Sequence, residues 1–144
     1  MKGTKVNIVP ITCQLFNLAV FTTDPNVESL EMILSQEESF SLRVTVEFGG
    51  SGAIAMMPLN MTINVTFFAE PYGLGSKLEL GSTSVNTYAG ILMYTPTLAI
   101  AKPAAVGLTP EEIYQVTGVL RVGAANWPAL ITGFIDGLVL QTYH

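Results

Sequence analysis

Residues 40–48 read Phe-Ser-Leu-Arg-Val-Thr-Val-Glu-Phe, an unbroken alternation of apolar and polar side chains. Successive side chains on a β-strand point to opposite faces, so this stretch predicts a strand with one face in a core. Residues 61–70 alternate almost as regularly. The other segments are short, rich in β-branched and aromatic residues, and separated by Gly, Pro and Asn. The chain is therefore expected to be an all-β protein.

The expected strands follow one another closely, with no long amphipathic helix between them. They cover residues 4–9, 13–22, 39–48, 61–70, 76–82, 91–100, 113–122 and 131–143, while residues 28–35 fit a short strand or one helical turn. About seven to eight strands of this kind pack as an antiparallel two-sheet sandwich. Residues 1–144 are expected to form this single β-sandwich domain, because 144 residues is the size of one ordinary domain.

Tyr114 provides a more specific cue. It lies just after a tight corner around Pro110 and two residues before Val116, which is expected to face inward. This arrangement resembles the tyrosine corner of immunoglobulin-like and fibronectin type III-like β-sandwiches, in which a Tyr on the penultimate strand ties down the preceding connection. The resemblance covers residues 108–143 and implies an immunoglobulin-like topology. The chain departs from antibody domains because it lacks the two core cysteines and its only Trp, Trp127, lies in an expected turn.

Charged residues make up only 12% of the chain, against about 25% in typical soluble domains. A small domain with so few charges either exposes an apolar patch, which usually marks an interface, or seals a large core beneath a neutral surface. We favour the interface, so a protein partner and homo-oligomerisation are expected. The net charge is −5 and the six Lys and Arg residues are scattered, which excludes the clustered cations that nucleic-acid binding needs.

The residues that usually carry catalysis are scarce. His144 is the only histidine and the last residue, and Cys13 is the only cysteine, so neither a catalytic triad nor a zinc site is expected. The adjacent carboxylates at 37–38 and 111–112 point to opposite faces of an extended chain and cannot act as a pair. The Gly-rich residues 49–52 match no phosphate loop. We therefore expect no enzyme activity and no cofactor.

A calcium site is a weaker alternative. Asp24, Asn26 and Glu28 have the spacing that begins an EF-hand loop. Ser29 and Ser35 then occupy the positions where that loop needs Gly and Glu, so the motif fails. The three oxygen-bearing residues could still hold calcium in a loop at one end of a sandwich, as in an exported surface domain.

Several apolar segments favour association. Residues 53–59 form an apolar run without alternation where a polar loop is expected, and Met adapts well to partner surfaces. Trp127 is a candidate anchor, since Trp is enriched in interface hot spots. The alternative is that both segments fold back to cap the ends of the sandwich. The candidate interface residues are Ile54, Met56, Met57, Leu59, Trp127, Leu138 and Leu140.

The strands at 13–22 and 131–143 are apolar on both faces, which indicates a second partner surface. In the first, one face is expected to carry Leu15, Ala19 and Phe21, and the other Phe16, Leu18 and Val20. In the second, one face is expected to carry Phe134, Leu138 and Leu140, and the other Ile135, Val139 and Tyr143.

The expected function is thus a non-catalytic interaction or structural module. A second hypothesis is a sandwich that binds a hydrophobic or carbohydrate ligand at one end, stacked on Tyr72, Tyr88, Tyr94 and Trp127. Residues 48–69 and 80–101 are uncharged but contain Gly or Pro, so no transmembrane segment is expected. One cysteine suits a cytoplasmic location. Export is the alternative, because lysines precede an uncharged run, although no cleavage site follows it.

Overall fold

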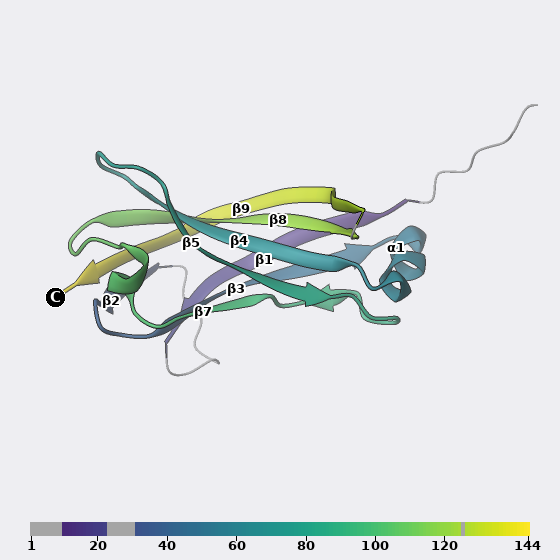
Figure 1. Cartoon of the computed structure of the whole chain (residues 1–144), viewed down its shortest axis with the longest axis horizontal. Coiled ribbons are helices and arrows are strands. Elements are labelled where there is room, and N and C mark those ends of the chain that lie inside the picture. Colours follow the sequence, from purple (N-terminus) through teal and green to yellow (C-terminus); the bar gives the residue numbers. More distant parts are fainter. Residues whose placement is uncertain (1–9, 23–30, 125) are drawn as a thin grey trace, which may run out of the picture.

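The computed structural model describes residues 10–22, 31–124 and 126–144. Nine strands within these residues form two stacked sheets, which confirms the predicted all-β two-sheet sandwich. The molecule is elongated along the strands (Figure 1). The short helix α1 lies at one end and the C-terminus at the other.

The first sheet is built around β3, the alternating stretch that predicts the fold. β3 pairs antiparallel with β1 on one side and with β6 and β7 on the other. The strand expected at 91–100 is split into β6 and β7, with Pro96 between them, because proline cannot donate to a ladder. The bounds are β1 (Thr12–Phe21), β3 (Phe40–Gly49), β6 (Met93–Tyr94) and β7 (Thr97–Ile100).

The second sheet has the order β2-β9-β8-β4-β5. Its pairs are antiparallel except for β2 and β9, which run parallel and depart from the purely antiparallel expectation. Both chain neighbours of β2 lie in the other sheet, so no hairpin fixes its direction. The bounds are β2 (Glu31–Ser35), β9 (Trp127–Tyr143), β8 (Ile113–Ala124), β4 (Thr62–Pro71) and β5 (Leu78–Asn86).

The core lies between the sheets and is filled by the inner faces of the strands. The apolar positions predicted from the alternation of β3 and β4 are all buried, and this confirms the predicted faces of both strands. They are Phe40, Leu42, Val44, Val46 and Phe48 on β3, and Ile63, Val65, Phe67 and Ala69 on β4.

The helices α1 (Ser51–Met56) and η1 (Met57–Leu59) close one end of the sandwich. Buried Thr87 joins them to the sheets: its hydroxyl donates to the Met57 carbonyl at 2.9 Å and accepts from the Met61 amide at 2.9 Å. The third helical segment is η2 (Pro103–Val106). No helix in the described part of the chain is long and apolar enough to cross a membrane.

Hydrogen bonds between buried polar groups stabilise the opposite end of the sandwich. The Gln36 side-chain amide donates to the Leu108 carbonyl at 3.0 Å and to the Thr142 hydroxyl. The Tyr114 hydroxyl accepts from the Thr109 amide at 2.9 Å, which is the tie that the tyrosine-corner resemblance implied. The immunoglobulin-like topology as a whole stays a prediction.

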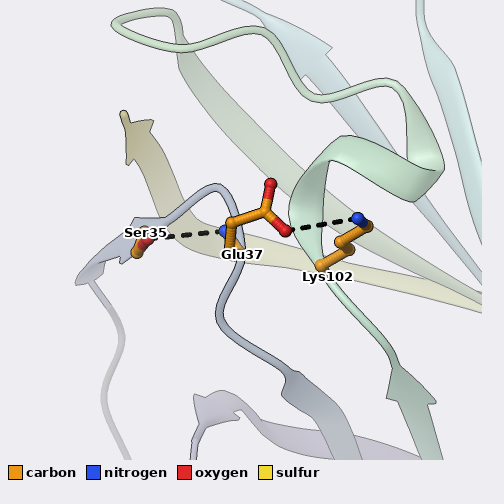
Figure 2. A network of polar contacts seen from close by, with 3 residues as sticks. All are labelled: Ser35, Glu37 and Lys102. Atoms are coloured by element: carbon orange, nitrogen blue, oxygen red, sulfur yellow. Dashed lines mark hydrogen bonds and ion pairs between the residues drawn. The ribbon is translucent and has the colours of Figure 1, made fainter.

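An exposed ion pair lies beside this end (Figure 2). The Lys102 ammonium contacts the Glu37 carboxylate at 3.2 Å, and the Glu37 amide donates to the Ser35 hydroxyl at 3.4 Å. The contact joins the residue before η2 to the turn after β2. Because both side chains are solvated, the pair contributes little to stability.

A bulge in β1 overturns the predicted assignment of its faces. Asn17 has a φ of 54°, and the register with β3 shifts between Phe16 and Ala19. The extra residue turns the following side chains over. Leu15 therefore shares the inner face with Leu18, and the prediction that it shares a face with Ala19 was wrong.

A second bulge, in β9, likewise overturns the predicted assignment of the faces of that strand. The register with β8 shifts beyond Ile135, and Gly137 has a φ of 105°. Phe134 is consequently on the outer face, while Leu138 and Leu140 point into the core. The prediction that these three residues share one face was wrong.

Candidate association surface

The most distinctive surface in the described part of the chain is a strand edge that no other described strand covers. β2 pairs with β9 only from Glu31 opposite Val139 to Ser35 opposite Tyr143. The earlier part of β9, up to the Gly137 bulge, pairs with β8 on one side and has no strand on the other among the described residues. We call its regular stretch, residues 130–135, the open edge.

A second sheet edge lies beside the open edge. β1 ends the first sheet, and it contacts β9 without joining its ladder. The approach is close at Gly133, where an added Cβ would lie 3.4 Å from the Leu15 side chain. Two strand edges, one from each sheet, therefore run next to each other on the same side of the sandwich.

A groove of about 720 Å³ runs between these edges. One wall comes from Ile11 and from Cys13, Gln14 and Leu15 of β1, and the other from residues 130–134 of β9. Leu120 of β8 lies at the base. The groove is open to solvent and offers both apolar side chains and strand backbone.

Large apolar side chains stand exposed along this side. Phe134 is 71% exposed and Leu130 is 56% exposed; Trp127, at the start of the same strand but outside the groove lining, is 71% exposed. Ile11 adds a further exposed group at the end of the groove. Burying large aromatic and aliphatic side chains of this kind supplies most of the binding energy of protein interfaces.

The two strand stretches that form this surface carry no charge, while Arg121 of the neighbouring strand β8 lies opposite Thr132. Residues 10–22 and 127–135 contain no Asp, Glu, Lys or Arg. Cys13 is the one ionisable side chain in the groove lining, and burial raises the pKa of its thiol above the ordinary value of 9.0. The thiol is thus neutral at physiological pH. Natural sheet edges are usually protected by charged residues, by proline or by short length; neither stretch has a charge, and their prolines, Pro10 and Pro128, lie outside residues 130–135.

The predicted interface residues fall into two groups. Ile54, Leu59 and Trp127 are exposed, at 64%, 67% and 71%, and could contact a partner. Four others are in the core of their own chain, with no more than 5% exposed, and the prediction that they line an interface was wrong for them. These are Met56, Met57, Leu138 and Leu140.

Each of the four has a clear physical reason for its burial. Met56 and Met57 cap one end of the core through α1 and η1, which is the alternative that the sequence left open for them. Leu138 and Leu140 were assigned to a face shared with Phe134, and the Gly137 bulge separates them from it.

The candidate stacking aromatics do not form one site. Tyr94 is only 8% exposed, and its hydroxyl is used inside the chain, donating to the Ile91 carbonyl at 2.6 Å. Its ring is therefore unavailable for stacking. Tyr88 lines a shallow groove with Tyr94, whereas Tyr72 and Trp127 do not line that groove. The prediction that these four residues gather around one ligand was wrong.

The calcium alternative lies outside the described residues, since Asp24, Asn26 and Glu28 fall within 23–30. Across the part of the chain that the structure describes, no three His, Cys, Asp or Glu side chains gather closely enough to hold a metal ion.

The predicted interface residues do not include Leu130, Ile11 or Phe134, although Phe134 was expected on one apolar face of the strand at 131–143. One signal was available: residues 127–135 form an uncharged run that ends at Asp136. What the sequence could not show is that β2 covers only the last part of β9.

Comparisons with known proteins give no family. No protein-family model matches the chain, and no curated protein matches its sequence. Among solved structures, AggA, the major subunit of aggregative adherence fimbriae type I from Escherichia coli, aligns with a TM-score of 0.46 and 7% identity, over 98% of this chain and 99% of that chain. A β-glucosidase from Listeria innocua in complex with glucose aligns with a TM-score of 0.44 and 11% identity, over 94% of this chain and 16% of that chain. Structural similarity this weak does not indicate a function.

Proposed function

We propose that this chain is a non-catalytic protein-association module that binds a partner through the open edge of β9 and the adjoining edge of β1. The observation that carries the proposal is the uncharged, apolar stretch of β9 that has no neighbouring strand on one side within residues 10–22, 31–124 and 126–144. Exposed Phe134 and Leu130 mark it as a surface that gains free energy when it is covered.

The mechanism is strand addition. A strand edge presents a row of backbone N–H and C=O groups, and an extended partner segment can pair with them. Backbone hydrogen bonds supply affinity, while alternate side chains of the added strand enter the groove and supply specificity. Here the groove beside Leu15 and Leu120 would receive the inward side chains of the added strand.

Photo-crosslinking tests this proposal in the cells that make the protein. A benzophenone amino acid is placed at Leu130, and at Tyr72 as a matched control. The two positions are similarly exposed, at 56% and 62%, but Tyr72 lies outside the groove that contains the open edge. Crosslinking to a polypeptide from position 130, well above that from position 72, is expected. Equal or absent crosslinking from position 130 contradicts the proposal.

A second candidate function rests on Tyr88. Its exposed ring lines a groove of about 540 Å³ together with the polar residues Ser84, Asn86 and Thr95. An exposed aromatic ring beside hydroxyl and amide groups suits a carbohydrate or a small amphipathic ligand. Loss of binding to a glycan array in Tyr88→Ala, with Tyr72→Ala as control, would support this candidate.

A further inference from the structure

We propose that the occupant of the open edge is the same edge of a second copy. β9 of one chain would pair antiparallel with β9 of the other, about a two-fold axis that passes through Thr132. This inference rests on the proposed association function and adds the identity of the partner and the register. Its basis is the pattern of side chains along residues 130–134, which is complementary to itself.

The outer face shows the first complementarity. In an antiparallel pair centred on Thr132, residues equally far before and after it face each other. Leu130 then lies opposite Phe134 of the second copy, and by symmetry the same contact forms twice. Both side chains point away from the core and are more than half exposed in one chain. Directly opposed apolar pairs of this kind are a main source of stability between strands.

The inner face of the strand shows a second complementarity between the two copies. The same register places Ile131 opposite Gly133 of the second copy. A large residue faces a residue with no side chain, so the two backbones can approach without overlap. The space beside Gly133 is bordered by Leu15, whose methyl group lies 3.4 Å from where a Cβ would stand. Ile131 and Leu15 both pack against the core, so the pair would extend the existing apolar interior.

Charge does not oppose this arrangement. The chain carries a net charge of −5, so two copies repel unless their contact avoids acidic groups. The nearest carboxylate on the strand is Asp136, four residues beyond Thr132. In the proposed pair the two Asp136 residues would lie at opposite ends of the ladder, about 25 Å apart. That separation exceeds the Debye length of about 8 Å at physiological ionic strength.

The size of the contact indicates a modest affinity. The ladder over residues 130–134, five residues on each chain, is about 17 Å long, and a stable interface of standard size buries about 800 Å² on each partner. Two exposed side chains outside the ladder, Ile11 of the groove and Trp127 at the start of β9, can add area to the contact. We therefore expect a reversible dimer in the micromolar range rather than an obligate one.

Sedimentation velocity on the purified full chain, from roughly micromolar to roughly millimolar concentration, gives the first test. We expect a monomer–dimer equilibrium. Leu130→Lys should weaken association about tenfold or more, because it places a charge against Phe134 in both symmetric contacts. Ile33→Lys is the matched control: Ile33 is 65% exposed on β2 and lies away from the open edge. It should leave the dimer intact.

A cysteine at the two-fold axis tests the register. Directly opposed residues have Cβ atoms about 4.5–5.5 Å apart, close to the separation that a disulfide bridges. In a Cys13→Ser background, Thr132→Cys should form an intermolecular disulfide on mild oxidation, while Thr117→Cys, on the outer face of β8, should not. Both positions carry threonine and face the same side of the sheet.

The outcomes separate this inference from the proposed function. A chain that stays monomeric at all concentrations, or a dimer that Leu130→Lys leaves unchanged, overturns the inference. A dimer in which Thr132→Cys is not crosslinked in preference to Thr117→Cys overturns the register. If the purified chain is monomeric while position 130 crosslinks to a different polypeptide in cells, the proposed function stands and the partner is not a second copy. If position 130 crosslinks to nothing, both fail.

Discussion

At the scale of single residues, the fold depends on a few buried polar groups that tie loops to strands. Tyr114 is 3% exposed, and its hydroxyl accepts the Thr109 amide at 2.9 Å. Thr87 is 2% exposed and has both of its hydroxyl contacts inside the chain. A buried hydrogen-bonding group that loses its partner costs more than the bond contributed, so these positions should be sensitive to small changes.

Tyr114→Phe removes only the hydroxyl and leaves the ring in the core. We expect the free energy of unfolding to fall by about 1–2 kcal/mol, because the Thr109 amide loses its acceptor. Urea denaturation followed by circular dichroism measures this change. Tyr72→Phe, at a position 62% exposed, is the control and should change stability by less than about 0.5 kcal/mol. Equal effects at the two positions would show that the corner hydrogen bond contributes nothing.

Thr87→Val keeps the shape of the side chain and removes its hydroxyl. Two backbone groups, the Met57 carbonyl and the Met61 amide, then lose a partner. A loss of about 2–4 kcal/mol is expected, measured by the same denaturation experiment. Thr95→Val, at an exposed loop position, is the control and should be close to neutral. A neutral Thr87→Val would mean that water replaces the hydroxyl.

Cys13 should react with alkylating reagents at a higher pH in the folded chain than in the unfolded chain. Only the thiolate reacts, and burial raises the folded pKa above the ordinary value of 9.0. Below that value both states keep the proton, so stability is unaffected by this group. As the pH rises past it, the unfolded state loses the proton first and stability declines. The rate of reaction with iodoacetamide, measured across pH with and without urea, tests the shift in thiol reactivity. Cys13→Ser should abolish the loss of stability at high pH.

At the scale of strands, the sequence predicts the faces of β3 and β4 correctly and those of β1 and β9 incorrectly. The difference is regularity. β3 has no extra residue where it pairs with β1, β6 and β7. In contrast, β1 at Asn17 and β9 at Gly137 each contain an extra residue that reverses which side chains face the core. The residue types Asn and Gly alone do not predict a bulge. Faces can thus be predicted from alternation only where the strand is unbroken.

The candidate surface was less predictable than the fold. Trp127 was identified from its residue type, but the open edge depends on β2 covering only five residues of β9, from Val139 to Tyr143. Such pairing joins segments about a hundred residues apart, and no local pattern specifies it. The burial of Met57 was equally hidden, because an apolar run between strands suits a cap and an interface alike.

The bulge in β1 can be tested through its backbone conformation. Asn17 has a φ of 54°, in the left-handed region that glycine and asparagine tolerate and alanine does not. We expect Asn17→Ala to lower the free energy of unfolding by about 1 kcal/mol and Asn17→Gly to leave it nearly unchanged. Thermal denaturation of the two variants measures the difference. Equal melting temperatures would argue against a left-handed residue at this position.

At the scale of the whole molecule, the acidic charge and the uncharged edge have opposite effects on association. The net charge of −5 repels a second copy, while the open edge attracts it through apolar contact. Added salt screens the repulsion and leaves apolar burial in place. Dimerisation should therefore strengthen as sodium chloride is raised, and also as the pH falls toward the isoelectric point near 4.6. Sedimentation velocity across a salt series checks this, and weaker association at high salt would indicate an ionic interface instead.

The parallel pairing of β2 with β9 also sets an order of events during synthesis. β2 is synthesised early, yet its ladder partner β9 is the last strand in the sequence. The hydrogen bond from the Gln36 side chain to Thr142 likewise cannot form until β9 has been made. While the chain is growing, the residues of β2 can join no strand of their own sheet, and β8 lacks one of its two neighbours. A chain that ends before β9 would expose a new sheet edge on β8 and leave β2 unpaired, and partly formed sheets of this kind aggregate. Synthesis of β9 thus completes the second sheet only at the end of translation.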